Sequence, residues 1–284
     1  MSERSASGTA LGTLYMRAIH QLLDARPLIF EDLPALTLLG RDKVEEIKKN
    51  HKHHRTQAAS ALRSHIVLRS RFAEDHLVEA VERGVSQYII LGAGFDTFAF
   101  RQPAWASKLK IFEVDQPASQ AQKLSRLKDV GITVPSNLKF AEIDFERESL
   151  REGLERHGIS MIEPSFFSWL GVTMYLKEEA IDAVLRTIAG FPVKSEIVFT
   201  FTHPPDSMSE KDSKFHSSLS RIVASSGEPF VSFFTPDAIE TKLRDIGFKS
   251  MGILSHEDAE MRYYNNRPRD LYISTRSAIA YAIV

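Results

Sequence analysis

The sequence predicts an α/β fold in which helices cover both faces of a mostly parallel, seven-stranded β-sheet. Short apolar runs alternate with helix-like stretches through the middle of the chain, glycines directly follow the first run, and aspartates close the second and third. Strands that alternate with helices are joined by right-handed crossovers, so neighbouring strands run parallel. Ligands of such sheets bind at the carboxyl edge, where these glycines and aspartates are expected to lie.

Residues 1–85 are expected to form a helical cap on a domain of residues 86–284. Residues 11–23 carry apolar side chains at the spacing of an amphipathic helix, and Pro27 and Pro34 interrupt the stretch that follows. Residues 42–50, 58–68 and 73–83 are predicted as further helices, with Gly84 as the C-terminal stop of the last.

Short apolar runs predict five strands, over residues 88–91, 110–114, 138–143, 166–170 and 197–201. Helices are expected between them over 117–128, 145–157 and 177–189, and Thr235 and Gly247 bracket another over 238–246. Residues 248–254 and 271–274 are predicted as strands, with 278–284 extending or replacing the last. The short connection between them predicts an antiparallel hairpin at the sheet edge.

The composition is that of an ordinary globular protein, with 43% hydrophobic and 26% charged residues. Its 36 basic and 37 acidic residues give a net charge of -1, which provides no overall field to attract nucleic acid or an acidic membrane. The absence of cysteine excludes disulfides, thiolate metal sites and cysteine nucleophiles. Residues 1–10 are polar and no run reaches roughly 18 apolar residues, so we expect a cytoplasmic protein without a membrane span.

Three nearby histidines, His51, His53 and His54, suggest a metal site at first sight. Adjacent histidines cannot all face one ion from a helix, and Lys52 and Arg55 surround them with positive charge. We therefore expect a solvated basic surface and no metal.

Gly92, Ala93 and Gly94 directly follow the first predicted strand. Glycines at a strand end allow a tight turn and the close approach of a ligand, although many such turns bind nothing. Thr97 stands where the third glycine of the dinucleotide pattern G-x-G-x-x-G would be, which disfavours a nicotinamide cofactor.

Asp115 and Asp144 end the second and third predicted strands. Asp115 is placed to accept hydrogen bonds from ribose hydroxyls, and Asp144 with Phe145 to bind and cover an adenine. Each aspartate alone is equally well explained as a helix N-cap. Their joint position at successive strand ends favours a nucleoside-containing ligand.

Residues 91–97 (Leu-Gly-Ala-Gly-Phe-Asp-Thr), followed by Arg101, resemble the signature of the leucine carboxyl methyltransferase family. Residues 113–117 (Glu-Val-Asp-Gln-Pro) resemble its next motif, residues 68–72 (Leu-Arg-Ser-Arg-Phe) its upstream arginine motif, and Thr9, Ala10 and Arg17 its opening. The resemblance implies a Rossmann-like class I methyltransferase with S-adenosylmethionine as cofactor.

The resemblance also implies roles for individual positions. Arg69 would pair with the carboxylate of the cofactor, with Arg71 as the alternative. Gly92, Ala93 and Gly94 would pass beside its methionine part, Asp115 would hold the ribose, and Asp144 and Phe145 the adenine. The family often has a glutamate where this chain has Leu170, so a contact made by that acid is lost or replaced, with Trp169 as alternative apolar cover.

Methyl transfer to a carboxylate needs alignment but no general base, because a carboxylate is already ionised at neutral pH. We therefore expect an O-methyltransferase acting on a carboxylate of a small metabolite, and assign no catalytic residue. The acceptor pocket is expected to combine the N-terminal helices with an insertion around residues 204–235. Its candidate residues are Tyr15, Arg17, Tyr175, His203, Phe234 and Tyr263.

Other functions stay open at the level of sequence. The acceptor can instead be a protein C-terminal carboxylate, or a phenol or alcohol, for which His203 is the candidate base. A nicotinamide-dependent oxidoreductase and a non-catalytic protein that binds the cofactor are the remaining alternatives. The sequence does not define the oligomeric state.

Overall fold

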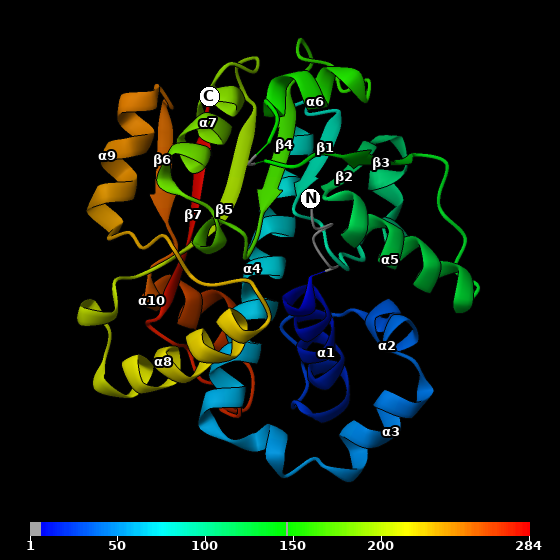
Figure 1. Ribbon diagram of the computed structural model, residues 1–284, viewed down its shortest axis with the longest axis vertical. Helices are drawn as coiled ribbons and strands as arrows, with labels where there is room; N and C mark the ends of the chain where they lie inside the picture. Colours follow the sequence, from blue (N-terminus) through cyan, green and yellow to red (C-terminus); the bar gives the residue numbers. More distant parts are fainter. Residues whose placement is uncertain (1–6, 146) are drawn as a thin grey trace.

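The computed structural model describes residues 7–145 and 147–284, and in them one seven-stranded sheet is covered by helices on both faces (Figure 1). The strands are β1 (Gln87–Leu91), β2 (Lys110–Asp115), β3 (Leu138–Glu142), β4 (Ser165–Trp169), β5 (Glu196–Thr202), β6 (Ser250–Ile253) and β7 (Ser277–Ile283). They lie in the order β3-β2-β1-β4-β5-β7-β6, and β7 runs antiparallel to both its neighbours. The predicted α/β fold with C-terminal antiparallel strands is confirmed.

The helices are α1 (Gly8–Leu23), α2 (Leu33–Leu39), α3 (Arg41–Lys49), α4 (Gln57–Glu82), α5 (Pro117–Asp129), α6 (Leu150–Arg156), α7 (Glu178–Ala189), α8 (Glu210–Ser225), α9 (Pro236–Ile246) and α10 (His256–Ala259). Short helical turns are η1 (His53–Arg55), η2 (Phe98–Phe100), η3 (Ala104–Lys108), η4 (Thr173–Tyr175), η5 (Pro205–Ser207) and η6 (Glu260–Tyr264). No helix in the described part of the chain combines the length and apolarity needed to cross a bilayer.

Alternate residues of the central strands enter two different apolar cores. Ile89 and Leu91 of β1 pack with the core that contains helices α6, α7 and α9, whereas Tyr88 and Ile90 pack with the core that contains α4. Successive side chains of a strand point to opposite faces, so a strand buried on both faces is apolar throughout. This explains why the strands appear in the sequence as continuous apolar runs.

Helices α1, α2 and α3 form a third apolar core at the carboxyl edge of the parallel strands (Figure 1). This core includes Phe95, from the loop after β1, and Leu127, from α5. The N-terminal helices therefore pack directly against the glycine loop.

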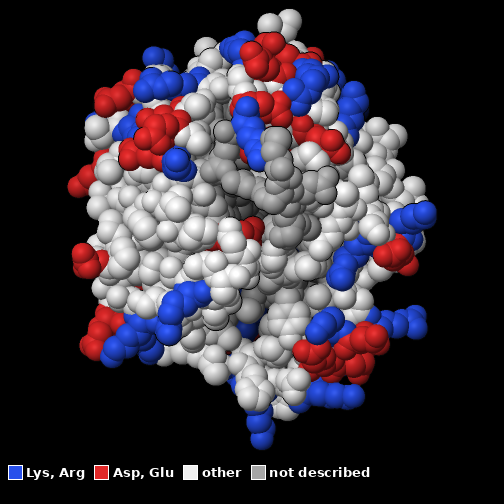
Figure 2. All heavy atoms as spheres, viewed as in Figure 1, with Lys and Arg blue, Asp and Glu red and all other residues white. Residues whose placement is uncertain are grey.

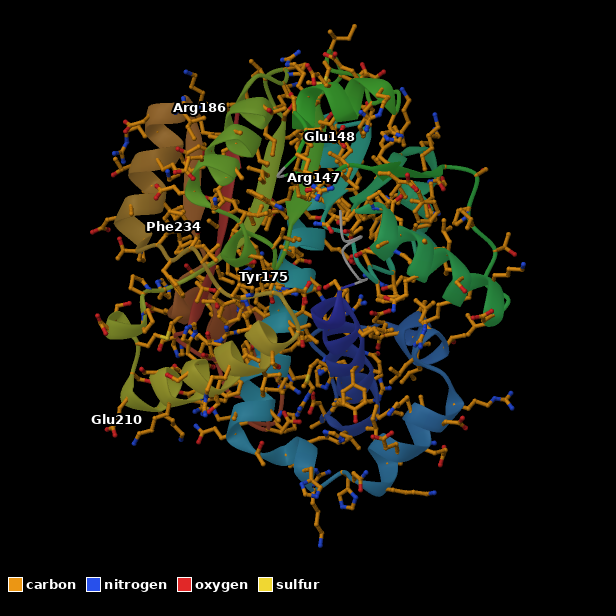
Figure 3. The ribbon with its side chains drawn as sticks, viewed as in Figure 1. Arg147, Glu148, Tyr175, Arg186, Glu210 and Phe234 are labelled. Atoms are coloured by element: carbon orange, nitrogen blue, oxygen red, sulfur yellow. The ribbon has the colours of Figure 1, made fainter. Side chains whose placement is uncertain are left out.

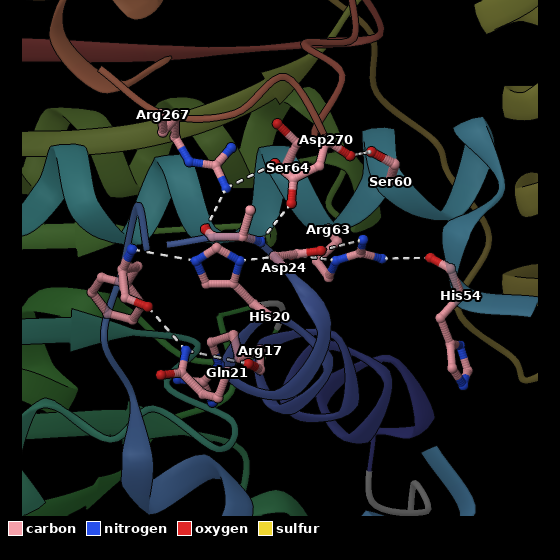
Figure 4. A network of polar contacts seen from close by, with 12 residues as sticks. Arg17, His20, Gln21, Asp24, His54, Ser60, Arg63, Ser64, Arg267 and Asp270 are labelled. Carbon is pink, nitrogen blue, oxygen red and sulfur yellow. Dashed lines mark hydrogen bonds and ion pairs between the residues drawn. The ribbon is translucent and has the colours of Figure 1, made fainter. Parts of the chain in front are cut away.

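A buried polar network fixes the end of α1 to α4 (Figure 4). Arg63 of α4 donates to both carboxylate oxygens of Asp24, each at 2.6 Å, and His20 Nδ1 lies 2.7 Å from Asp24 Oδ2. Arg267 donates to two backbone carbonyls of the segment after α1 and pairs with Asp270 at 2.9 Å. The network joins the N-terminal helices to a loop near the end of the chain.

The predicted division of residues 58–83 into two helices is wrong, because α4 is continuous. Arg69 and Phe72 are buried on its packed side, and no glycine or proline lies between them to end the helix. The predicted helix over 145–157 begins only at Leu150, and position 146 lies outside the described residues.

The predicted strand over 271–274 is also wrong. The carboxylate of Asp212 accepts hydrogen bonds from Ser274 Oγ at 3.0 Å and from the Thr275 backbone N–H at 2.9 Å, so this segment is held by a side chain and not by a strand ladder. Residues 277–283 replace it as β7, and the chain between β6 and β7 runs through α10 and is longer than a hairpin turn. Helices α2, α8 and α10 lie where the sequence pattern predicts no helix.

Candidate functional site

The carboxyl edge of the sheet borders a cavity of about 600 Å³. It lies between the ends of β1, β2 and β4, the start of α1, and residues 226–231. On the face shown in Figure 2, charged side chains of both signs gather over the upper part and along the lower part of the molecule.

The glycine loop forms one wall of this cavity in a conformation that favours glycine. Gly92 and Gly94 have positive φ angles of 64° and 49°. A Cβ atom at Gly92 would collide with Val172, and one at Gly94 would lie 3.1 Å from the Cβ of Ala10. The start of α1 and the loop after β4 therefore close tightly on the glycine loop.

Asp115 lies at the end of β2 and lines the same cavity. Its Oδ2 accepts the backbone N–H of Gly94 at 2.6 Å, and its Oδ1 accepts that of Gln116 at 2.7 Å. Burial raises the pKa of the Asp115 carboxyl, while these two amides act in the opposite direction. The carboxylate thus fixes the glycine loop and keeps lone pairs for further donors.

Arg69 of α4 brings a buried positive charge to the cavity. Its side chain is 9% exposed, and no carboxylate pairs with it among the residues that the structure describes. Burial lowers the pKa of Arg69 to about 10, which still leaves the guanidinium charged at neutral pH. A Cβ atom at Gly171 would lie 2.8 Å from its Cζ, so the guanidinium lies directly against the loop after β4. Arg71 instead lies at the surface and pairs with Asp75 at 2.7 Å.

Phe145 and Leu170 line the cavity, whereas Asp144 lies beside it. The ring of Trp169 meets that of Phe145 edge-on, with centroids 6.4 Å apart, but Trp169 is fully buried in the core behind it. Asp144 Oδ2 lies 3.6 Å from Arg147 Nε at the edge of this region. Trp169 therefore supports the cavity wall without forming its surface.

Two of the predicted acceptor residues, Arg17 and Tyr175, line the cavity. Arg17 is buried and engaged: it pairs with Asp32 at 2.9 Å and donates to the Phe95 carbonyl. Burial raises the pKa of Tyr175, so its hydroxyl keeps its proton at neutral pH. In Figure 3 Tyr175 lies at the centre of the molecule, between the sheet and α8.

The other four predicted acceptor residues, Tyr15, His203, Phe234 and Tyr263, do not line the cavity. Tyr15 points from the far side of α1 to His54, with its hydroxyl 3.3 Å from His54 Nε2. Phe234 packs near Lys242 of α9 (Figure 3), and His203 packs edge-on against Phe201. Tyr263 donates to Asp75 at 2.8 Å. In this structure these four side chains make their contacts outside the cavity lining.

Ser7, Thr9, Ala10 and Thr13 at the start of α1 line the cavity and are not among the predicted site residues. Glu228, in the segment after α8, also lines it and lies within the insertion around residues 204–235 that was expected to contribute to the acceptor pocket. Thr9 and Ala10 do belong to the opening motif, which was the available signal. Among the described residues, no group of three or more histidines and acids is arranged to hold a metal ion.

The chain resembles known methyltransferases along most of its length. The sequence profile of the leucine carboxyl methyltransferase family matches residues 10–189. YktD of Bacillus subtilis (strain 168), whose name places it among S-adenosyl-L-methionine-dependent methyltransferases, is 31% identical over 292 residues that cover 95% of each chain. A relative from Mycobacterium marinum with the same class name is 28% identical over 225 residues, which cover 77% of this chain and 74% of that protein.

Solved structures share the fold at low sequence identity. A protein of Thermobifida fusca, named as a methyltransferase, has a TM-score of 0.59 and 16% identity, with 99% of this chain and 95% of that chain covered. A duf574 family protein of Streptomyces avermitilis has a TM-score of 0.56 and 14% identity, with coverage of 98% and 97%. With the family match over residues 10–189, the chain belongs to the leucine carboxyl methyltransferase family and is an S-adenosyl-L-methionine-dependent methyltransferase.

Proposed function

We propose that this enzyme methylates a carboxylate of a small-molecule acceptor by in-line transfer, without a general base. S-adenosylmethionine supplies a methyl group on a positively charged sulfur, which a carboxylate oxygen can attack in its ordinary ionised state. The protein then has to bind cofactor and acceptor, align them and keep water away. Such positioning lowers barriers by up to roughly 7–11 kcal/mol in favourable systems.

The residues around the glycine loop fit the methionine part of the cofactor. The buried guanidinium of Arg69 has no carboxylate partner in the described residues and faces the cavity, so a ligand carboxylate would complete a charge-assisted pair. Gly92, Ala93 and Gly94 leave room beside it that side chains would fill or strain. We assign the cofactor carboxylate to Arg69 and not to Arg71, which is already paired at the surface.

The adenosine part is assigned to the ends of β2, β3 and β4. Asp115 retains acceptor capacity for ribose hydroxyls beyond its two backbone amides. Phe145 offers a ring face to the adenine, and Asp144, its neighbour, is assigned to the adenine amino group. Leu170 supplies an apolar contact where the family often has a glutamate.

The observation that carries the carboxylate assignment is that the described lining of the cavity contains no histidine, the side chain that most often serves as a general base at neutral pH. Its acids Asp96, Asp115 and Glu228 each accept a hydrogen bond from a backbone N–H, and Asp115 is assigned to the ribose. Tyr175 keeps its proton at neutral pH. A phenol or alcohol must lose a proton in the reaction, whereas a carboxylate need not.

The cover over the cavity supports a small acceptor. The first turn of α1, within the proposed cap of residues 1–85, meets residues 226–231 of the insertion around 204–235 through a hydrogen bond from the Thr9 N–H to Glu228 Oε2 at 3.1 Å. Ala10 lies against Gly94 in the same region. We infer that the first turn of α1 and residues 226–231 cover the acceptor and exclude water. A covered site accommodates a small metabolite more readily than the C-terminus of a protein.

Labelled methyl transfer tests this function. The purified protein is incubated with methyl-labelled S-adenosylmethionine and a library of carboxylic acids, and the labelled products are treated with mild base. We expect label that base releases as methanol, because carboxylic esters hydrolyse under these conditions, and no label in the matched amides. Base-stable label in the product would contradict carboxyl methylation and favour a phenol or alcohol.

A further inference from the structure

A second buried arginine, Arg276, lies outside the cavity lining but interacts electrostatically with Tyr175, which lines it. Arg276 immediately precedes β7, its side chain is 5% exposed, and its guanidinium forms no ion pair with the residues that the structure describes. The carboxylate of Asp212 acts on it electrostatically, but its oxygens already accept hydrogen bonds from Ser274 and Thr275. An unpaired buried charge costs several kcal/mol, so a counter-ion from outside the chain would stabilise this arrangement.

Arg276 belongs to a group of basic side chains, and the acid that acts on it, Asp212, already accepts hydrogen bonds from Ser274 and Thr275. Electrostatic interactions join it to Arg69, to Tyr175 and to the two buried histidines His65 and His216. Burial, followed by the field of the arginines, lowers the pKa of both histidines, so their rings are neutral at neutral pH. His65 Nε2 and His216 Nδ1 have no hydrogen-bond partner in the described part of the chain. Arg276 Cζ lies 6.0 Å from the centroid of the Phe215 ring on α8. These groups from α4, α8 and the start of β7 therefore offer donors and positive charge that no carboxylate of the described residues pairs with directly.

Aromatic rings connect this group to the cavity. Tyr175 lines the cavity, and its ring centroid lies 5.5 Å from that of Phe230. Phe230 stacks on His216 at 5.4 Å with an interplanar angle of 29°, and Phe233 meets the other side of His216 at 5.7 Å. The wall of rings thus leads from the cavity toward the region of Arg276. Such a wall suits the apolar or aromatic body of a ligand.

We propose that Arg276 binds the carboxylate of the acceptor, whose apolar body lies along Tyr175, Phe230 and His216. This subsite rests on the proposed carboxyl methylation. Arg69 and Arg276 then have separate partners, because Arg69 lies against Gly171 at the glycine-loop side, where the cofactor carboxylate is assigned. Arg69 would bind the carboxylate of the cofactor, and Arg276 would bind the carboxylate of the acceptor.

The chemistry of the step gives this arrangement a consequence for product release. An oxygen of the acceptor carboxylate forms the bond to the methyl carbon as the carbon–sulfur bond breaks, the electron pair goes to sulfur, and no proton moves. The resulting ester is neutral and loses its charge-assisted hydrogen bond to Arg276, which is roughly twice as strong as a neutral one. Arg276 therefore discriminates the substrate from its product.

The test compares acids with their uncharged amides. Wild type, Arg276→Gln and Arg276→Lys are titrated calorimetrically with 3-phenylpropionate, octanoate and the two matching amides, at saturating S-adenosylhomocysteine. We expect wild type to bind the acids at least about tenfold more tightly than the amides. Arg276→Gln should lose this preference, and Arg276→Lys should keep part of it. Arg221→Gln, which removes an exposed arginine of α8, is the control and should leave the preference unchanged.

The cofactor site and the reaction are tested separately from the Arg276 subsite, by the affinity for S-adenosylhomocysteine and by the stability of the methylated product to base. The affinity of each variant for S-adenosylhomocysteine shows that the fold and the cofactor site are intact, and we expect less than about a threefold change for Arg276→Gln. The proposal is overturned if wild type does not prefer acids, if Arg276→Gln keeps the preference, or if both Arg276 variants lose S-adenosylhomocysteine binding. A base-stable methylated product would overturn carboxyl methylation, and with it this role for Arg276, even where the preference for acids is retained.

Discussion

Glu228 Oε2 accepts a hydrogen bond from the backbone N–H of Thr9 at 3.1 Å, and both residues line the cavity. Thr9 lies in the first turn of α1, where backbone N–H groups have no partner within the helix and negative charge is favourable. The contact therefore ties the segment after α8 to the helix that covers the glycine loop. We call this hydrogen bond between Thr9 and Glu228 the clasp.

Replacing Glu228 by alanine should open this clasp and weaken cofactor binding. A hydrogen bond to a charged group contributes about 1.5–3 kcal/mol, and partial exposure reduces this, so we expect S-adenosylhomocysteine to bind about 3- to 10-fold more weakly by calorimetry. Glu228→Gln keeps an acceptor oxygen but loses the charge, and should lose less affinity than Glu228→Ala. Glu210→Ala, an exposed acid of α8, is the control. Equal losses for Glu228→Gln and Glu228→Ala would mean that the negative charge matters and the clasp does not.

Arg69→Gln should abolish most cofactor affinity, whereas Arg71→Gln should leave it unchanged. Removing one partner of a buried charge pair costs about 2–5 kcal/mol, so we expect S-adenosylhomocysteine to bind at least about 30-fold more weakly to Arg69→Gln. Arg71 pairs with Asp75 at the surface, and its loss touches no residue of the cavity. A large effect of Arg71→Gln on the dissociation constant would contradict the assignment of the cofactor carboxylate to Arg69.

Gly171→Ala should displace the Arg69 guanidinium and lower cofactor affinity without unfolding the protein. The new Cβ would lie 2.8 Å from Arg69 Cζ, so the guanidinium has to shift from its place against the loop after β4. Gly158→Ala is a matched control, because Gly158 has a φ angle of 75° against 77° for Gly171 but has open space around it. Both variants place an alanine at nearly the same positive φ angle. We expect the affinity for S-adenosylhomocysteine to differ about tenfold between them, because the collision with Arg69 occurs in Gly171→Ala and not in Gly158→Ala.

The sequence alone does not decide whether Arg69 or Arg71 faces the cavity. Two residues along a helix differ in direction by roughly 200°, so one of the pair had to face the sheet and the other solvent. Which one does depends on how α4 packs, and the unpredicted continuity of α4 through Phe72 decides it. The strands and the glycine loop were predictable because apolar runs, positive-φ glycines and strand-end acids are local signals.

The positions of the candidate acceptor residues depend on contacts between distant segments, and four of the six lie outside the cavity lining. Tyr15 shares α1 with Arg17, but the helix turns it toward His54 on the side away from the cavity. Glu228 lies 219 residues from Thr9 in the sequence, and no local pattern links them. The positions of such residues depend on tertiary packing, and the sequence pattern of a single segment carries no information about it.

Asp24→Asn should destabilise the protein by loosening α1 from α4. The variant leaves Arg63, whose side chain is 2% exposed, without its bidentate carboxylate, and breaking a buried pair costs about 3–5 kcal/mol. Urea unfolding at neutral pH should show this loss, with Glu45→Gln, an exposed acid of α3, as the unaffected control. A loss below about 1 kcal/mol would show that solvent replaces the pair.

The stability that the Asp24 carboxylate contributes should fall at low pH. Burial raises the pKa of Asp24, but the hydrogen bonds from His20 and Arg63 outweigh it and hold the pKa below its usual value of 3.8. A carboxyl whose folded pKa is depressed contributes stability above its unfolded pKa and loses it as the pH falls through the folded pKa. The difference between wild type and Asp24→Asn in urea midpoint should therefore persist at neutral pH and narrow below pH 3.8.

The turnover rate should be independent of His203 and of pH near neutrality. A carboxylate with a pKa near about 4 is fully ionised above pH ~6, so no protein group has to remove a proton. Burial lowers the pKa of His203, so a role as base would appear as a rise of kcat with pH at a value below 6.5, and its removal would cost about 10²- to 10⁴-fold. We expect His203→Asn to keep kcat within about threefold of wild type with the acid that the labelling assay identifies, and both profiles to be flat. The backbone N–H of His203, which bonds the Arg276 carbonyl at 3.0 Å, is retained in this variant, so the measurement isolates the imidazole. A loss of 10²-fold or more would restore His203 as a base and with it a phenol or alcohol as the acceptor.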